Sequence, residues 1–368
     1  MILLGFSILE QLSFYGYFMK KIKFYGYFMK KIKYGLFSVF HLPNVLLNIF
    51  LLQIVKFMPK NLAIQYNNNR EMDGIGAQLQ RIFAIFSIAK NLNLEYCKSI
   101  IQDITTHPLD PFQSYADRKK YVAKLNDFLN FINCEDEILP IDIENIRIIE
   151  VDSLSPYKLF KYAFLSNFTN GRVRLVTLNV YSIIDLRPNF YKTVQSYFLK
   201  HGKYAVNKNI IVHYRRGVGN YALYGQQSIP RELPLSYYKK LWLYLQESGI
   251  CSDTSKIIVF TDSPLNKTFY RPPTDQMSTW VGTPGYSEGI MTIEAIDFNE
   301  IFKGYPGEIE IYAGGDPLDS LLVMTGAQHL FLSRSSFSYI AGILNPNGIV
   351  YCAPKFWHSK MPSWKIVK

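Results

Sequence analysis

The sequence predicts an α/β protein with two domains. Two stretches share the order strand, turn, helix: the apolar run Leu62–Tyr66 leads through a glycine-bearing turn into a helical pattern, and His329–Leu332 leads through a serine-rich turn into another. The apolar strand 348–352 follows the second helix, which gives a βαβ unit. The chain has 368 residues, 48% of them hydrophobic and 19% charged. This is enough for two buried cores and is unlike a disordered protein.

Residues 1–60 differ from the rest in charge and contain a repeat. They hold eight lysines and one acidic residue, Glu10, and so carry +7 of the formal charge of +11. The ten residues Phe14–Lys23 recur unchanged as Phe24–Lys33. Alternating aromatic and lysine blocks suit an anionic membrane surface, and polar residues interrupt the apolar run 34–58, which favours an in-plane helix over a spanning one.

We therefore expect residues 1–60 to be a membrane-associating extension, with the protein at the cytoplasmic face of a membrane. A Golgi-type signal anchor is one alternative. A duplicated, dispensable leader is another.

The glycine-bearing turn, Asp73-Gly74-Ile75-Gly76-Ala77-Gln78, is the first candidate site. It opens a helix with apolar residues at helical spacing, namely Leu79, Ile82, Phe83, Phe86 and Ala89. Two glycines allow backbone to approach a ligand closely. A plain turn before a helix is the alternative reading.

Structural signals fill the chain between the candidate sites. Apolar spacing predicts an amphipathic helix over 121–132, and 146–151 reads as a strand. We place a domain boundary near residue 205, so that 61–205 and 206–368 are the two domains. Downstream, Asp316 is a predicted N-cap with Pro317 at the first position of a helix that runs to residue 325.

Two arginines follow the apolar run 209–212, in the segment His213-Tyr214-Arg215-Arg216-Gly217. A guanidinium presents a planar fork of donors that matches phosphate, and burying two of them at a strand end is costly without an anion. An anionic ligand is therefore predicted. Pairing with local carboxylates is the alternative.

The serine-rich turn Ser333-Arg334-Ser335-Ser336-Phe337-Ser338 opens the helix that runs through Ile340 and Leu344. Serines cap a helix start, and the backbone N–H groups and dipole there favour an anion. This turn is a second predicted anion site.

These segments, in this order, resemble the fucosyltransferase superfamily with the two-domain GT-B fold, in particular the bacterial-type α-1,2-fucosyltransferases and the related protein O- and α-1,6-fucosyltransferases. The resemblance covers most of residues 62–358. It is carried by the G-x-G-x-Q turn at 74–78, the H-x-R-R-G box at 213–217, the segments 233–238 and 259–264, and the tail from 322 through S-S-F-S at 335–338 to 357.

The resemblance implies two Rossmann-like domains facing across a cleft, and an inverting enzyme that transfers fucose from GDP-fucose to a glycan hydroxyl, with α-1,2 linkage favoured. Carried over by position, it implies diphosphate contacts from Arg215, Arg216, Ser335, Ser336 and Phe337. It places His213 and Asp262 toward guanine or ribose and the glycine turn, Gly74, Gly76 and Gln78, at the donor. No metal and no cofactor are expected, since fixed cationic donors stabilise the leaving diphosphate.

Two departures from the family pattern concern the acceptor and the donor. Val218 stands where the H-x-R-R-G box usually continues with an aspartate, and Ala77 stands where an asparagine commonly precedes the glutamine. Asp73 is our candidate base for the acceptor hydroxyl, with ordinary turn chemistry as its alternative. Glu294 and Asp297 read equally as a solvated face or strand edge.

Other residue classes argue against metal or nucleic-acid functions. The four cysteines, 97, 134, 251 and 352, have no C-x-x-C spacing, which disfavours zinc and a disulfide framework. Outside residues 1–60 the formal charge is only +4. Two alternatives to fucose transfer stay open: transfer from another nucleotide sugar, and a non-catalytic glycan- or nucleotide-binding protein of the same fold.

Overall fold

The computed structural model describes residues 41–58, 61–67, 74–104, 114–133, 146–167, 172–215, 221–224, 227–230, 233–252, 256–261, 267–271, 289–293, 297–354, 356 and 358–367. The chain divides into two compact units, residues 1–50 and 51–368. Everything below concerns the second unit, apart from the helix α2 (His41–Phe57), which begins in the first.

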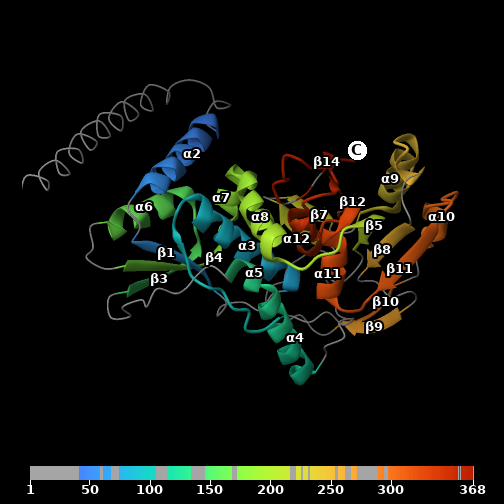
Figure 1. The fold of residues 1–368 in the computed structure, drawn as a ribbon, viewed down its shortest axis with the longest axis horizontal. Coiled ribbons are helices and arrows are strands. Elements are labelled where there is room, and N and C mark those ends of the chain that lie inside the picture. The colour runs from blue at the N-terminus through green and yellow to red at the C-terminus, as the bar shows by residue number, and fades with distance from the viewer. Residues whose placement is uncertain are drawn as a thin grey trace, which may run out of the picture. The chain divides into compact units, whose positions relative to one another are not determined.

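The second unit contains two parallel sheets (Figure 1). The first sheet has the order β2-β1-β4-β3 and consists of β1 (Leu62–Tyr66), β2 (Glu95–Tyr96), β3 (Ile146–Ser153) and β4 (Arg172–Asn179). The second has the order β11-β8-β5-β12-β13-β14 and consists of β5 (Asn207–Tyr214), β8 (Lys256–Thr261), β11 (Glu308–Ala313), β12 (Ala327–Phe331), β13 (Ile349–Cys352) and β14 (Lys365–Ile366). All strand pairs within both sheets are parallel.

We call residues 62–201 the first half and 207–366 the second half. Helices of the first half are α3 (Ile75–Asn91), α4 (Tyr115–Phe128), α5 (Asn130–Asn133), α6 (Pro156–Ser166), α7 (Tyr181–Leu186), the 3-10 turn η2 (Pro188–Phe190) and α8 (Tyr191–His201). Those of the second half are α9 (Leu235–Glu247), the 3-10 turn η3 (Ile250–Ser252), α10 (Phe298–Ile301), α11 (Pro317–Thr325) and α12 (Ser336–Leu344). Two antiparallel hairpins are also present, β6 (Tyr221–Tyr224) with β7 (Gln227–Pro230) and β9 (Lys267–Arg271) with β10 (Gly289–Ile293).

The α/β class with two parallel sheets, predicted from the sequence, is confirmed by this architecture. The domain boundary near residue 205 stays a prediction. One expected element differs: the helix predicted over 121–132 is divided, with α4 ending at Phe128 and a short turn of helix beginning at Asn130.

The second sheet is apolar because it is covered on both faces. Ile210 and Val212 pack in one hydrophobic cluster with α9, whereas Ile211 packs in another with α11 and α12. Successive residues of a strand point to opposite faces, so a strand buried on both sides reads as an uninterrupted apolar run. The same rule sends His213 to the face of Ile211, toward α12.

The core that includes α12 joins the two halves. Helix α12 packs against α11 of the second half and also against α3 and α8 of the first (Figure 1), and buried residues of both halves belong to one cluster. That cluster includes Leu52 and Val55 of α2. The end of α2 therefore belongs to the compact unit, although the sequence places it within the extension 1–60.

Among the residues that the structure describes, no helix is long and apolar enough to cross a membrane.

Candidate functional site

The order of strands in the second sheet defines where a ligand would bind. Taken in chain order, its six strands have the arrangement 3-2-1-4-5-6, which is that of a Rossmann fold. The order reverses between β5 and β12, which are hydrogen-bonded neighbours. In open parallel sheets, ligands bind outside the carboxyl ends of the strands at such a switch point.

Both predicted anion segments lie at this switch point. Arg215 directly follows β5, and the serine turn begins two residues after the last residue of β12. The Nη1 atom of Arg215 donates a hydrogen bond to Oγ of Ser335, 3.0 Å away. The Nε atom of Arg215 is buried and has no hydrogen-bond partner within the described part of the chain. The guanidinium is thus fixed at one end and has a buried donor at its base that no carboxylate of the described residues satisfies.

His213 lies two residues before Arg215, on β5, and contacts the same loop. Its side chain is only 6% exposed, and its Nδ1 atom lies 2.6 Å from Oγ of Ser333. The ring also contacts Phe337, with 5.9 Å between ring centroids. His213 therefore helps to hold the serine turn against β5.

The serine turn is internally hydrogen-bonded. Ser335 is the N-cap of α12, and its Oγ accepts from the backbone N–H of Phe337 at 3.3 Å. The hydroxyl of Ser338 donates to the carbonyl oxygens of Ser333 and Ser335. These bonds orient the first turn of α12, whose dipole favours negative charge at this end.

The glycine turn is brought to the same place from the first half. A Cβ atom on Gly76 would lie 2.5 Å from the backbone nitrogen of Phe337, so the first turns of α3 and α12 are in backbone contact. Gly74 is the N-cap of α3, with φ −63°, and a Cβ atom placed on it would have nothing within 4 Å. Of the two glycines, only Gly76 is required by the packing.

Gln78 has a role in the protein interior. Its side chain is 2% exposed, and its Nε2 atom donates to the carbonyl oxygen of Asp103 at 2.8 Å. It fixes the segment after β2 to the first turn of α3. The predicted donor contact of Gln78 stays a prediction.

Three of the predicted site residues, Asp73, Arg216 and Asp262, lie outside the described residues, as do Val218 and Glu294. Ser336 and Phe337 lie in the first turn of α12, where both are partly exposed. Asp297 is the N-cap of α10, since its carboxylate accepts from the backbone N–H groups of Asn299 and Glu300.

No individual role was predicted from the sequence for two residues of the serine turn, Ser333 and Arg334. Ser333, fully buried, pairs with His213. Burial lowers the pKa of Arg334, while Tyr237 and Tyr238 nearby on α9 raise it in part. The signal that could have found them is their position just after a strand, because the residues at the carboxyl end of β12 lie at the switch point.

The described residues contain no group of three or more histidine, cysteine or acidic side chains that could hold a metal ion.

Comparisons with known proteins found structural similarity only at low TM-scores, and no matching sequence. No protein-family model and no curated protein matches the sequence. Among solved structures, the E. coli heptosyltransferase WaaC with ADP-2-deoxy-2-fluoro heptose is similar at a TM-score of 0.34 and 9% identity, covering 83% of this chain and 92% of WaaC.

POFUT1 in complex with GDP is similar at 0.34 and 11% identity, over 79% of this chain and 97% of POFUT1. POFUT1 in complex with GDP-fucose is similar at 0.35 and 11%, over 81% and 99%. Similarity at these TM-scores carries no information on activity or substrate.

Proposed function

We propose that the protein is a glycosyltransferase of the GT-B type that binds a nucleotide diphosphate sugar at the switch point of its second sheet. GDP-fucose is the first candidate donor and a glycan hydroxyl the acceptor, with α-1,2 linkage favoured. The fucosyltransferase-like order of the sequence segments supports this choice.

The hydrogen bond between Arg215 and Ser335 is the observation that carries the proposal. It places a permanent cation beside the N-terminus of α12, at the point between β5 and β12 where the strand order of the sheet reverses. A diphosphate is the anion that suits a guanidinium fork together with a helix N-terminus. It would also satisfy the buried Nε of Arg215, which otherwise costs free energy.

The proposed reaction makes use of the same charges. The acceptor oxygen attacks the anomeric carbon as the bond from that carbon to the phosphate oxygen breaks, with inversion. The bonding electrons leave with the nucleoside diphosphate, whose negative charge grows in the transition state. Arg215, Arg216 and the first turn of α12 would stabilise that charge because they are already oriented.

The acceptor proton has to pass to a base. Asp73, one residue before the cap of α3, remains our candidate for it. The contact of Gly76, three residues after Asp73, with Phe337 supports this candidate. We further propose that His213 and Asp262 face the guanine or the ribose, and that no metal takes part.

We also propose that residues 1–40 tether the enzyme to an anionic membrane surface at the cytoplasmic face. The six lysines of the duplicated segment and its aromatic residues support this. The choice of GDP-fucose as donor and the role of residues 1–40 as a membrane tether are independent, so failure of one leaves the other standing.

A ligand panel tests the nucleotide. The melting temperature of the full chain is measured with GDP, UDP, ADP and GDP-fucose, each with and without EDTA. A ligand that binds only the folded state stabilises it by mass action. We expect the largest rise with GDP or GDP-fucose and no effect of EDTA. A preference for ADP would point to a different donor, and no rise with any nucleotide would refute the site.

A further inference from the structure

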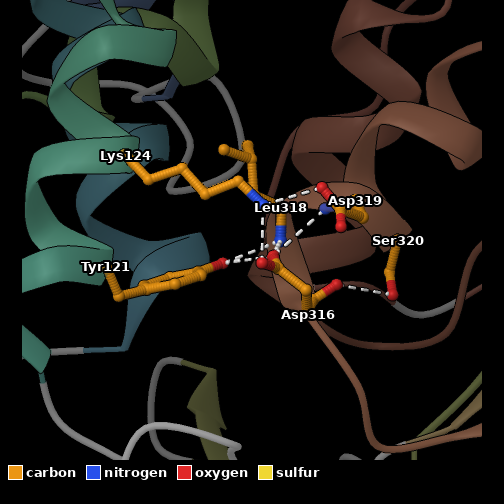
Figure 2. Close-up of polar contacts among 6 residues, drawn as sticks. All are labelled: Tyr121, Lys124, Asp316, Leu318, Asp319 and Ser320. Atoms are coloured by element: carbon orange, nitrogen blue, oxygen red, sulfur yellow. Dashed lines mark hydrogen bonds and ion pairs between the residues drawn. The ribbon is translucent and has the colours of Figure 1, made fainter. Parts of the chain in front are cut away.

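A second polar cluster joins the two halves, and Figure 2 shows its contacts. It consists of Tyr121 and Lys124 on α4 of the first half and of Asp316 and Asp319 at the start of α11 of the second half. We call these four residues the clasp. Between 192 and 197 positions separate the partners along the chain.

The contacts of the clasp are short and mutually compatible. Lys124 Nζ lies 2.6 Å from Oδ2 of Asp316 and 2.8 Å from Oδ1 of Asp319. The hydroxyl of Tyr121 donates to Oδ1 of Asp316 at 3.1 Å and accepts from the backbone N–H of Leu318 at 2.7 Å. Tyr121 thus supplies a donor and an acceptor to the same helix start, which phenylalanine could not do.

Asp316 has two functions in this arrangement. Its Oδ1 atom caps α11 by accepting from the backbone N–H groups of Leu318 and Asp319, and its Oδ2 atom pairs with Lys124. The carboxylate is delivered by Gly314 and Gly315, both of which have positive φ, 77° and 101°. Such a turn favours glycine at both positions.

The clasp lies at the same edge of the second sheet as the switch point. Asp316 follows the carboxyl end of β11, just as Arg215 follows that of β5. The strand β8 separates β11 from β5, so the clasp is roughly 10 Å along the edge from the arginine strand. The backbone N–H of Gly314 also donates to the carbonyl oxygen of Thr261 at the end of β8.

On the first half, hydrogen bonds connect α4 with the glycine turn. The side chain of Asn126, two residues after Lys124, makes two bonds with the backbone of Ile101. Two residues after Ile101, the carbonyl oxygen of Asp103 accepts a hydrogen bond from the side chain of Gln78 in the first turn of α3. Hydrogen bonds and short stretches of chain therefore connect the clasp with the first turn of α3, which contains Gly76.

We propose that the clasp is a positioning device, which fixes the first half, with its glycine turn, at a set distance from the nucleotide-binding edge of the second half. That this distance positions an acceptor against a donor rests on the proposed function. That the clasp holds the two halves at a set distance does not. The core at α12 holds the halves together, and the clasp sets their separation at the ligand edge. Its residues are not catalytic.

Hydrogen exchange on the full-length protein tests the clasp without reference to activity. The variants are Tyr121→Phe and Lys124→Met, with Lys124→Arg as the conservative variant and Lys120→Met as the control. Lys120 is an exposed lysine one turn earlier on α4. We expect the amides of residues 318–320 and 76–80 to exchange about fivefold faster in the first two variants, the scale of one hydrogen bond or ion pair. Lys124→Arg and Lys120→Met should behave as the wild type.

Kinetics provide the second measurement. We expect Tyr121→Phe and Lys124→Met to lower kcat/KM for the acceptor about fivefold while the Kd of GDP changes less than twofold. A positioning role predicts this separation, whereas disturbance of the nucleotide site would lower kcat/KM and raise the Kd of GDP together. Unchanged exchange in both variants would overturn the proposal, as would an equal loss of GDP affinity. If no nucleotide binds the wild type, the proposed function fails, and exchange at residues 76–80 alone decides for or against the clasp.

Discussion

The backbone of Gly76 touches the backbone of Phe337: a Cβ atom on Gly76 would lie 2.5 Å from the nitrogen and 2.6 Å from the Cα of Phe337. The two residues begin helices of different halves. This contact places the glycine turn beside the Arg215–Ser335 pair and shows why the sequence has glycine in the first turn of a helix, where it is otherwise unfavourable.

Substitution of the two glycines should therefore have opposite outcomes. We expect Gly76→Ala to lower the free energy of unfolding by about 1–3 kcal/mol, as overpacking does when the obstacle is backbone. Gly74→Ala is the matched control, because the added Cβ would meet nothing within 4 Å and the φ of −63° suits any residue. Urea unfolding of both variants measures the difference. Equal stability of the two would contradict the close contact.

Removal of the Arg215 guanidinium should affect catalysis more than folding. We expect Arg215→Ala to lower kcat about 10²-fold or more, the scale of losing one preorganised donor to the leaving group. Arg215→Lys should restore little, because lysine lacks the planar fork that reaches Ser335 and an anion together. Arg147→Ala, an exposed site on the edge strand β3, serves as the control. Turnover near that of the wild type in a folded Arg215→Ala would remove this residue from the mechanism.

The clasp should make stability depend on pH in the acid range. Partial burial raises the pKa of Asp316, but the hydrogen bonds from Lys124 and from the amides of Asp319 and Leu318 outweigh it, so that the pKa falls below its usual 3.8. A lowered folded-state pKa contributes stability that is present above the unfolded pKa and is lost as the pH falls through the folded pKa.

Comparison with Asp316→Asn isolates this contribution, since asparagine can still cap α11 but does not titrate. The difference in unfolding free energy between the wild type and this variant should be constant from pH 7 to about pH 5 and should shrink below about pH 4. Urea titrations across that range measure it. A difference that stays constant to about pH 3 would show that the Asp316 carboxylate does not gain from its partners.

Two deletions at the N-terminus should separate membrane binding from stability of the fold. Removing residues 1–40 should abolish binding to liposomes that contain acidic lipids and leave the fold intact, and added salt should weaken binding of the full chain by screening its lysines. Removing residues 1–60 should also destabilise the fold, because it takes away Leu52 and Val55, which are buried in the main core. Sedimentation with liposomes and thermal unfolding measure the two effects. Retention of the 1–40 deletion on liposomes would contradict the tether.

The parallel strands and their helices could be predicted from the sequence because the second sheet is covered on both faces. Runs such as 209–212 are apolar throughout for that reason. The N-cap at Asp316 was predictable as well, since a capping carboxylate before a proline is a local signal. The break of helix between α4 and α5 was not, because apolar spacing continues across Leu129.

Contacts between the halves could not be read from the sequence. The same Asp316 whose capping role was predicted also pairs with Lys124, 192 positions away, and no local pattern encodes that partner. The interior role of Gln78 was hidden for the same reason, since its partner is a backbone carbonyl. Local signals identify which residues begin an element, and tertiary packing determines what their side chains meet.

The affinity of GDP for the wild type and for Arg215→Ala, measured by isothermal titration calorimetry with UDP and ADP as competitors, tests the central claim most directly. The Arg215–Ser335 pair at the switch point should bind the diphosphate, which GDP, UDP and ADP share. The choice of GDP-fucose as donor adds the expectation that the wild type binds GDP more tightly than UDP or ADP. Arg215→Ala, with an unchanged melting temperature in the absence of ligand, should bind GDP at least tenfold more weakly, which corresponds to about 1.4 kcal/mol. Equal GDP affinity in the two proteins would contradict the account.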